Sequence, residues 1–367
     1  MRVGVHKVLM NSPADVAGLE RLIEAGEVAP AEIVAVIGKT EGNGGANDFT
    51  RALATLSFAL ALARHLGITP DAVAKRIAFV WSGGTEGVLS PHATVFTRSA
   101  APAAASKRLA IGIAATRDLA PEEVGTMVEV RLVAEAVRRA QAEAGIADAA
   151  DVHYVQVKGP LLTPAAVADA DSRGARLVTR DPNGSKPYAR GATALGVALA
   201  LGEVAEAALG DEAIARRMDL YSSVANTSAG GELSKCEVLL FGNAEGAGGD
   251  LRIGHAVLRD VVDAEGVRAA AASAAGEPGE LREPGAAIDP AGIAAIFAKA
   301  EAPPDGRLRG RRTTMLSDAD IHYERHARAA LGAVIASVTG DGAIFVSGGT
   351  EHQCKPGEAP IAAIVRV

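Results

Sequence analysis

The sequence predicts an α/β protein built from three homologous modules, and two observations lead to that prediction. A turn rich in serine and glycine follows a strand-like apolar run at three places in the chain. Apolar residues make up 49% of the 367 residues but aromatic residues only 3%, which predicts a globular core of small aliphatic side chains. Three homologous modules suggest a pseudo-threefold arrangement in which the three turns meet on the axis.

The three turns share a serine with a glutamate four residues later. The first and third turns are identical over five residues although they lie 265 residues apart, a match that chance does not explain in a chain of this length. The middle turn has diverged more. The turns are Ser82-Gly83-Gly84-Thr85-Glu86, Ser228-Ala229-Gly230-Gly231-Glu232 and Ser347-Gly348-Gly349-Thr350-Glu351.

A lysine that follows an apolar run and an arginine that precedes a small residue come before each serine, always in that order. The arginine opens a helix-like run, and in the first copy Leu53, Leu56 and Leu60 fall on one helical face. The intervals differ between copies, so insertions separate them. The residues are Lys39 and Arg51, Lys158 and Arg190, and Lys299 and Arg328.

Local signals in the first copy predict the order strand, helix, strand, helix, strand. We predict a strand at Arg2–Leu9 and a helix over Pro13–Ala25, with Ser12 as its N-cap and Gly26 placed to end it. The elements that follow are predicted as a strand at 33–38, a helix at 50–65 and a strand at 76–81.

Two changes of composition divide the chain. Residues 99–107 are rich in Ala and Pro and residues 244–250 in Gly, so both are predicted to be linkers. The stretch 273–290, rich in Gly, Glu and Pro, is predicted to be a surface loop. The predicted modules, which share one central site, are residues 1–104, 105–250 and 251–367.

The recurring residue types suit acyl chemistry. A serine hydroxyl is a weak nucleophile until a base removes its proton, and a neutral lysine can be that base. Burial and a nearby arginine both lower the pKa of a lysine. The glycines let backbone N–H groups approach a substrate oxygen, and arginine adds a fork of donors. Each module could therefore bind one carbonyl of a small flat ligand, and the residues alone do not choose which copy reacts.

Charge and cysteine content exclude several classes of protein. A net charge of −7 argues against a general nucleic-acid binder. The longest apolar runs, such as Ala192–Leu201, are too short to span a bilayer. The two cysteines, Cys236 and Cys354, have no metal-like spacing, which favours a reducing, cytoplasmic location. Cys236 lies in an apolar run and is predicted to be a buried small side chain.

Longer stretches around these residues are more specific than any short motif. At them, and over nearly the whole chain, the sequence resembles the cyanuric acid hydrolase/barbiturase family of ring-opening amidohydrolases. The stretches are GKTEGNGGANDFTR (38–51), WSGGTEGVLSPH (81–92), VKGPLLT (157–163), RGATALGVALALGEV (190–204), SSVANTSAGGELSKCEVLLFGN (222–243) and FVSGGTEHQ (345–353).

The resemblance implies a fold in which the sheets form a central barrel-like core with the helices outside, and assembly into a homotetramer. It implies no organic cofactor and a small cyclic imide as substrate, with neither nucleic acid nor membrane as a partner. The reaction is hydrolysis of a ring C–N bond. Cyanuric acid would give carboxybiuret, which loses carbon dioxide to form biuret.

The resemblance also assigns roles within the three copies. It implies that Ser228 is the nucleophile and Lys158 its base, with Lys39 and Lys299 in supporting roles. The residues that would hold the substrate carbonyls are Arg51, Ser82, Gly83, Arg190, Ser228, Ala229, Arg328, Ser347 and Gly348.

A structural cation, usually magnesium, is implied near the third turn. Glu301 would be its carboxylate ligand. The loop after Gln353 departs from the Gly- and Pro-rich pattern of the family, because it contains a cysteine, a lysine and a glutamate. The other expected ligands, by side chain or backbone oxygen, are Thr350, Gln353, Cys354, Lys355 and Glu358.

Three alternatives remain open at this point. The first is a barbiturase, which acts on barbituric acid; three near-equivalent carbonyl sites favour the threefold-symmetric cyanuric acid instead. The second is a non-catalytic protein that binds a small imide, against which the intact Lys158 and Ser228 argue. The third is a Ser-Lys amidase for linear amides, which would leave three equivalent arginines unexplained.

Overall fold

The computed structural model describes residues 1–276 and 290–367, and three four-stranded sheets in it have the same topology. In each, the first strand pairs with the last, the last with the second, and the second with the third. Only the pairing of the second strand with the third is parallel. The strands, in sheet order, are β1 (Arg2–Leu9), β4 (His92–Ser99), β2 (Ile33–Thr40) and β3 (Ala78–Gly83); β5 (Arg108–Ala115), β8 (Glu237–Ala244), β6 (Val152–Pro160) and β7 (Ala225–Gly230); and β9 (Leu251–Leu258), β14 (Ala359–Arg366), β10 (Ile293–Ala300) and β13 (Phe345–Gly348).

The second strand of each sheet carries the same irregularity. Its pairing with the last strand shifts register two residues after its start, and a single 3₁₀ turn precedes it in every copy. A β-bulge of this kind bends its strand and increases the local twist. The shifts lie between Ile33 and Ala35, between Val152 and Tyr154, and between Ile293 and Ala295. The repeat inferred from short turns therefore extends to whole sheets.

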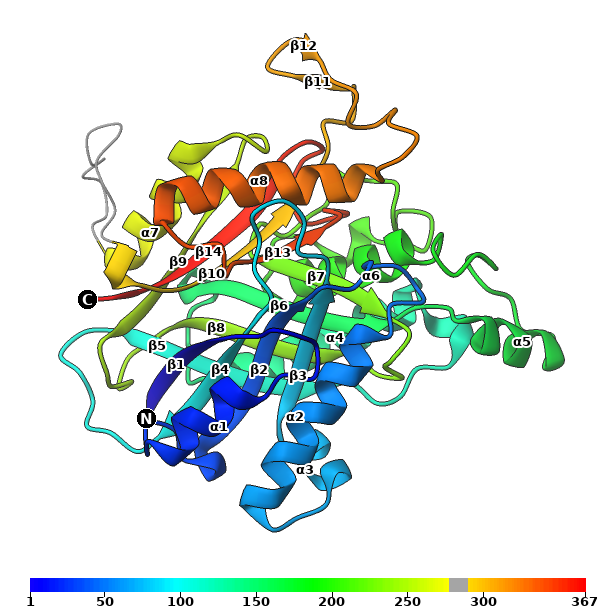
Figure 1. Cartoon of the computed structure of the whole chain (residues 1–367). Helices are drawn as coiled ribbons and strands as arrows, with labels where there is room; N and C mark the ends of the chain where they lie inside the picture. Colours follow the sequence, from blue (N-terminus) through cyan, green and yellow to red (C-terminus); the bar gives the residue numbers. More distant parts are fainter. Residues whose placement is uncertain (277–289) are drawn as a thin grey trace.

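The three sheets pack together at the centre of the molecule, and the helices lie outside them (Figure 1). Apolar side chains from all three form one buried cluster. Within it, the rings of Phe96 on β4 and Phe241 on β8 lie 5.0 Å apart, and Phe297 on β10 lies 6.3 Å from each. The prediction of sheets inside and helices outside is confirmed. The described strands form three separate four-stranded sheets and one two-stranded hairpin, and no closed barrel.

The helices cover the outer faces of the sheets. Those of eight residues or more are α1 (Ala17–Glu24), α2 (Thr50–Leu66), α4 (Met127–Glu143), α5 (Pro164–Ser172), α6 (Lys186–Ala200), α7 (Ala264–Ala275) and α8 (Tyr323–Thr339). Shorter elements are α3 (Pro70–Arg76), five 3₁₀ turns (Pro30–Glu32, Pro121–Glu123, Ala149–Asp151, Glu206–Ala208 and Pro290–Gly292) and the hairpin of β11 (Arg307–Leu308) with β12 (Arg311–Arg312).

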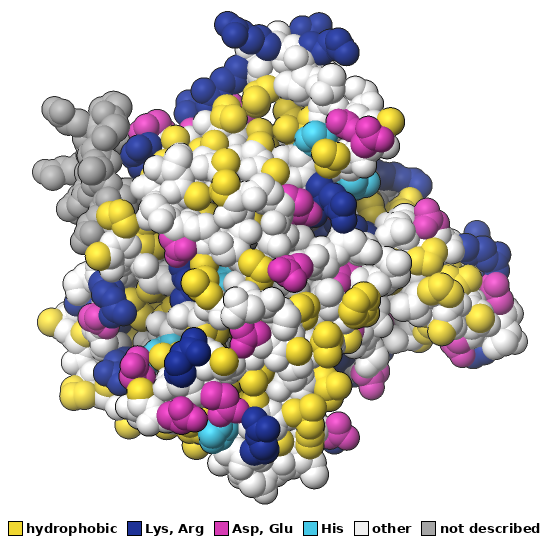
Figure 2. Space-filling view, in the orientation of Figure 1, with side chains coloured by type: hydrophobic (Ala, Val, Ile, Leu, Met, Phe, Trp, Pro, Cys, Tyr) yellow, Lys and Arg dark blue, Asp and Glu magenta, His cyan; other side chains and the backbone are white. Residues whose placement is uncertain are grey.

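The leucines of α2 predict which face of this helix packs against its sheet, but the opposite face does so. Leu53, Leu56 and Leu60 are 37%, 52% and 48% exposed. Instead, Phe58 packs edge-on against the Trp81 ring of β3 with centroids 5.1 Å apart. Apolar side chains are accordingly visible on the surface of Figure 2 that carries α2. The helix can bury its other face because alanines and Phe58 supply enough apolar surface there.

Most predicted elements are present, with shifted ends. The strand Arg2–Leu9 is confirmed. The first helix begins at Ala17 rather than at Pro13, because the carboxylate of Asp15 accepts the Ala17 N–H at 3.0 Å and Ser12 caps nothing. The strand predicted at 76–81 runs from Ala78 to Gly83, since α3 occupies the residues before it.

The connections between the sheets are short. Residues 100–107 join β4 to β5, and residues 245–250 join β8 to β9, where linkers are predicted. Of the predicted loop 273–290, residues 273–275 are instead the last turn of α7, and residues 277–289 lie outside the described part. In the described ranges, no single helix is long and apolar enough to cross a membrane, although the bent pair α2–α3 passes that test together.

Candidate active site

Each sheet places its lysine directly beside its serine. The lysine lies near the end of the second strand and the serine on the parallel third strand, at the same register. Parallel strands end at the same edge of a sheet, so the recurring order lysine then serine is one structural motif seen three times. All three lysine side chains are buried. The paired residues are Lys39 and Ser82, Lys158 and Ser228, and Lys299 and Ser347.

Two of the lysines also reach a strand of another sheet. Lys158 Nζ donates to the carbonyl oxygen of Trp81 at 3.2 Å, and Trp81 directly precedes Ser82. Lys299 Nζ donates to the carbonyl oxygen of Thr227 at 2.8 Å, one residue before the second serine. The three turns therefore meet at one centre, as the repeat predicts.

The three serine hydroxyls have different partners. Ser82 Oγ accepts a hydrogen bond from Lys39 Nζ at 3.0 Å. Ser347 Oγ donates to the Asn226 amide oxygen at 3.4 Å. Ser228 Oγ is buried and has no hydrogen-bond partner in the described part of the chain. Because a buried hydroxyl normally finds a partner, this hydroxyl is left free for a ligand.

The three arginines link the modules in a ring. Each lies near the N-terminus of α2, α6 or α8, is buried, and binds the glutamate four residues after the serine of the next turn. Charge-assisted pairs of this kind are short and geometrically specific. The shortest contacts are Arg51 Nε to Glu232 Oε1 at 2.9 Å, Arg190 Nη2 to Glu351 Oε1 at 2.7 Å, and Arg328 Nη2 to Glu86 Oε1 at 2.5 Å.

Burial lowers the pKa of all three lysines and so favours their neutral form. Burial, reinforced by the charge of Arg328, lowers the pKa of Lys39 well below its usual value. Burial and the charge of Arg190 do the same to the pKa of Lys299. Burial also lowers the pKa of Lys158, but the Glu232 carboxylate counters it and leaves the value at about 8. A lysine with a pKa of about 8, such as Lys158, can take up and release a proton near neutral pH.

The divergence of the middle turn has a steric reason. A Cβ on Gly83 would lie 1.8 Å from a carboxylate oxygen of Asp48, and one on Gly348 would lie 2.9 Å from the Glu324 Cβ. Both positions therefore require glycine. At the middle turn the same position holds Ala229, whose side chain packs against a small apolar cluster.

A cavity of about 360 Å³ opens above the arginines. Its walls come from all three modules, with Gly44 from the first, Lys186 from the second and Glu324 from the third. Lys186 Nζ bridges the other two, 3.3 Å from the Gly44 carbonyl oxygen and 3.4 Å from Glu324 Oε2. Arg190 and Arg328 line the cavity, so it adjoins two of the three arginines of the ring.

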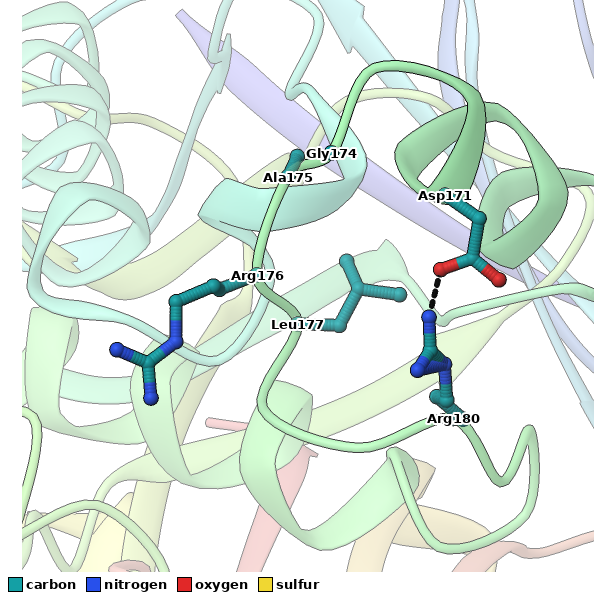
Figure 3. A pocket seen from close by; sticks show the side chains of 6 residues that line it. All are labelled: Asp171, Gly174, Ala175, Arg176, Leu177 and Arg180. Carbon is teal, nitrogen blue, oxygen red and sulfur yellow. Dashed lines mark hydrogen bonds and ion pairs between the residues drawn. The ribbon is translucent and has the colours of Figure 1, made fainter.

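A larger cavity lies away from this chemistry. It measures about 650 Å³ and is formed by the loop that follows α5 (Figure 3). Arg180 points across it toward Asp171, with which it forms an ion pair, while Arg176 points away. None of the predicted site residues lines it. Size alone is therefore a poor guide to the site in this fold.

The expected cation ligands are partly brought together. Glu301 Oε2 accepts the Thr350 backbone N–H at 3.0 Å and its hydroxyl at 2.9 Å. Gln353 is buried, but its side-chain oxygen accepts the Thr227 N–H at 2.8 Å. Burial and the charge of Glu351 raise the pKa of Glu301. A half-buried carboxylate that feels the charge of a second carboxylate fits a cation, which would offset both charges.

In the rest of the predicted ligand loop, one side chain is buried, one is exposed, and one backbone oxygen is already hydrogen-bonded. Cys354 is buried, and Lys355 is exposed on a turn closed by the Glu358 N–H and the Lys355 carbonyl at 3.0 Å. No cluster of three His, Cys, Asp or Glu side chains suited to a metal occurs among the described residues. A cation here would depend on Glu301 and carbonyl oxygens.

Sequence reasoning missed the acidic residues of the site. The glutamates Glu86, Glu232 and Glu351 were visible as the last residue of each turn, and their recurrence was the signal that could have assigned them to the arginines. Glu324 contacts Arg190 at 3.0 Å and Lys186 at 3.4 Å, and nothing in the sequence singles it out. Cys236 is buried, as predicted.

Comparisons with known proteins match one family over nearly the whole chain. The family model described as amidohydrolase ring-opening protein matches residues 4–366. A relative from Azorhizobium caulinodans named cyclic amide hydrolase is 69% identical over 372 aligned positions, and one from Enterobacter cloacae named cyanuric acid amidohydrolase is 50% identical over 378; each alignment covers 100% of both chains.

Solved structures of similar proteins have the same fold. A cyanuric acid hydrolase structure described as an innovation by structural concatenation superposes with a TM-score of 0.92 at 50% identity, covering 100% of this chain and 99% of its own. A cyanuric acid hydrolase from A. caulinodans superposes with a TM-score of 0.90 at 46% identity and the same coverage. The chain therefore belongs to the family of ring-opening amidohydrolases.

Proposed function

We propose that the protein hydrolyses cyanuric acid, opening the ring to carboxybiuret, which then loses carbon dioxide to give biuret. The observation that carries the proposal is the threefold recurrence of a buried lysine in register with a serine around one centre. Cyanuric acid has three equivalent carbonyl groups, one for each copy. The relatives named above as cyanuric acid amidohydrolases support the same substrate.

The substrate ring lies between the three turns. One serine, the backbone of the residue after it, and one arginine hold each carbonyl oxygen. The arginines keep their glutamate partners, which fix the guanidinium planes so that their remaining N–H groups face the ring. Preorganised donors stabilise the charge that develops on a carbonyl oxygen during attack.

Bond breaking follows a Ser-Lys sequence at the second copy. Neutral Lys158 takes the Ser228 proton as Ser228 Oγ attacks a ring carbon, and the carbonyl oxygen becomes an oxyanion. The oxyanion then collapses, the ring C–N bond breaks, and the leaving nitrogen takes the proton from Lys158. Water next attacks the acyl-enzyme, again giving its proton to Lys158, and Ser228 leaves with that proton.

One distance favours a different pair of residues as nucleophile and base. Lys39 Nζ lies 3.0 Å from Ser82 Oγ, whereas no hydrogen bond joins Lys158 to Ser228 in the described structure. Ser82 with Lys39 is therefore the competing nucleophile and base. The unpartnered Ser228 hydroxyl and a lysine pKa of about 8 favour the second copy, since a group that both accepts and returns a proton works best near its pKa.

Barbituric acid is the alternative substrate, because one carbon replaces a ring nitrogen and all three carbonyls remain. The 69% identical relative carries the broader name cyclic amide hydrolase, so both rings belong in the assay. Purified protein is incubated with each compound, loss of ring absorbance is followed, and products are identified by mass spectrometry. We expect biuret from cyanuric acid; turnover of barbituric acid alone, or of neither ring, contradicts the proposal.

We further propose that the protein is a cytoplasmic homotetramer with a structural magnesium ion near Glu301. The exposed leucines of α2 supply apolar surface for contacts between subunits, and both cysteines are free and buried, as suits a reducing compartment. When bound, the ion offsets the buried charge of Glu301 and so stabilises the loop that carries Thr350 and Gln353.

A further inference from the structure

The glutamates of the three turns are equivalent in position but not in contacts. Each binds an arginine, yet only Glu232 also approaches a lysine, with Oε1 3.4 Å from Lys158 Nζ. Within residues 1–276 and 290–367, no carboxylate forms an ion pair with Lys39 or Lys299. The second copy therefore differs in having a carboxylate at ion-pair distance from its lysine. Glu86 and Asp48 act on Lys39, and Glu351, Glu324 and Glu301 on Lys299, only from farther away.

Arg51 holds the Glu232 carboxylate in place and charged. Its Nε donates to Glu232 Oε1 at 2.9 Å, the same oxygen that faces Lys158. Burial alone would raise the pKa of Glu232, but the charges of Lys158 and Arg51 outweigh it and hold the pKa at about 2. One carboxylate oxygen thus joins an arginine of the first module to the lysine of the second.

We propose that Glu232 is the positioning residue that makes Lys158, alone among the three lysines, able to gain and lose a proton during turnover. This inference rests on the proposed function and deepens it. A buried lysine with no carboxylate in ion-pair contact favours the neutral form and serves as a hydrogen-bond donor, as Lys39 and Lys299 do toward backbone oxygens. A buried lysine beside a fixed carboxylate can hold the proton that the nucleophile releases and return it to the leaving nitrogen.

The charges around Lys158 support this division. Glu232 follows β7 and favours the ammonium form, as does Asp48, which lies just before α2. Arg51 on α2 opposes it. Burial is the largest influence and favours the neutral amine, so the pKa of about 8 reflects a balance that removal of Glu232 would upset.

The geometry also lets Lys158 exchange partners. Its Nζ is bound to the Trp81 carbonyl and to Glu232, while its register partner Ser228 lies directly across the parallel pair. Since the Ser228 hydroxyl has no partner in the described structure, a rotation of the lysine side chain can bring the amine to it without breaking another hydrogen bond of the serine. Glu232 then holds the lysine between proton transfers.

The test is the pH profile of kcat/KM for cyanuric acid in Glu232→Gln. Activity needs neutral Lys158, so kcat/KM rises with pH through the lysine pKa. Loss of a carboxylate within 4 Å lowers that pKa, and we expect the acidic limb to move down by about one to three pH units. The matched control is Glu86→Gln, because Glu86 is the equivalent glutamate of the first turn and binds Arg328, and its charge acts on Lys39 rather than on Lys158. Its acidic limb should coincide with that of the wild type.

A second variant and a readout without substrate keep the inference testable. Glu232→Asp retains the charge at a longer distance and should move the limb less than Glu232→Gln. Independently, unfolding of Glu232→Gln between pH 6 and 8 should take up more protons than unfolding of the wild type, by up to about one, because its folded-state lysine is neutral over more of this range. Circular dichroism establishes that each variant is folded.

The outcomes separate the two proposals. If the wild type hydrolyses cyanuric acid but neither the limb nor the proton uptake changes in Glu232→Gln, the role of Glu232 is wrong and the proposed function stands. If the wild type does not act on cyanuric acid, the proposed function fails, and the proton uptake on unfolding still decides whether Glu232 sets the pKa of Lys158. A limb that moves equally in Glu86→Gln also overturns the role of Glu232.

Discussion

Arg190 on α6 and Glu351 after β13 form a two-point ion pair, with Nε to Oε2 at 2.8 Å and Nη2 to Oε1 at 2.7 Å. The pair joins the second sheet to the third, just as Arg51 and Glu232 join the first to the second. Arginine is suited to this because its planar fork matches both oxygens of a carboxylate. The ring of pairs therefore fixes the three turns around the central site.

Replacing Arg190 with lysine should weaken both the fold and substrate binding. Lysine keeps the charge but cannot span both oxygens of Glu351, and the site is buried. We expect the free energy of unfolding to fall by about 1–3 kcal/mol and KM to rise. Denaturant unfolding and initial rates measure the two effects.

Arg217→Lys is the matched control. Arg217 binds Asp219 through two contacts of similar length, but the pair is exposed. It should leave both stability and KM unchanged, because exposed ion pairs contribute little. Equal losses in the two variants would show that the buried pair has no special role.

Gly349→Ala should destabilise the protein more than Gly67→Ala. Both glycines have a positive φ, +81° and +65°, which costs an alanine about 1 kcal/mol. At Gly67 a Cβ meets nothing within 4 Å, whereas at Gly349 it would lie 2.3 Å from the Arg190 guanidinium carbon. Thermal unfolding of both variants checks the difference; equal melting temperatures would show that the arginine is not tightly held.

The buried Glu129 should make stability depend on pH. Burial raises the pKa of this α4 carboxyl to about 8, above its unfolded value of 4.5. The folded state therefore holds a proton that the unfolded state lacks between these two values, so stability falls as pH rises, by at most about 1.4 kcal/mol per pH unit. Glu129→Gln should remove this slope, as judged by unfolding free energies from pH 5 to 8. An unchanged slope would exclude Glu129 as its source.

Magnesium should stabilise the protein through Glu301. A ligand present at 100 times its Kd adds about 2.7 kcal/mol to the stability of the state that binds it. Dialysis against a chelator should lower the melting temperature of the wild type, and magnesium should restore it. In Glu301→Gln the ion should have no effect. A wild-type protein that responds to neither treatment lacks the cation site.

The fold could be predicted as far as its repeat. Identical turns at Ser82 and Ser347 identified the copies, and apolar runs located the second strands, because buried strands have strong local signals. The packing face of α2 could not be predicted from Leu53, Leu56 and Leu60, since the opposite face is also apolar and the sheet contacts decide between them. The first helix begins later than predicted, where the Asp15 carboxylate accepts the Ala17 N–H and no side chain caps the helix.

The site could be predicted in its residue types but not in its pairings. The serines, lysines and arginines were visible as a repeated order. Which glutamate binds which arginine depends on how the modules are arranged around the centre, and a single module carries no information on that. For the same reason Glu324, which contacts residues of the second module from the third, has no sequence signal.

Turnover of cyanuric acid by Ser82→Ala, Ser228→Ala and Ser347→Ala shows which serine is the nucleophile. We expect Ser228→Ala to lower kcat on the order of 10⁴-fold or more, as for loss of a nucleophile. Ser82→Ala and Ser347→Ala should remain active with a raised KM, because each removes one hydrogen bond to a carbonyl. Full activity in folded Ser228→Ala, with activity abolished in Ser82→Ala, would contradict the claim and assign the chemistry to Lys39 and Ser82.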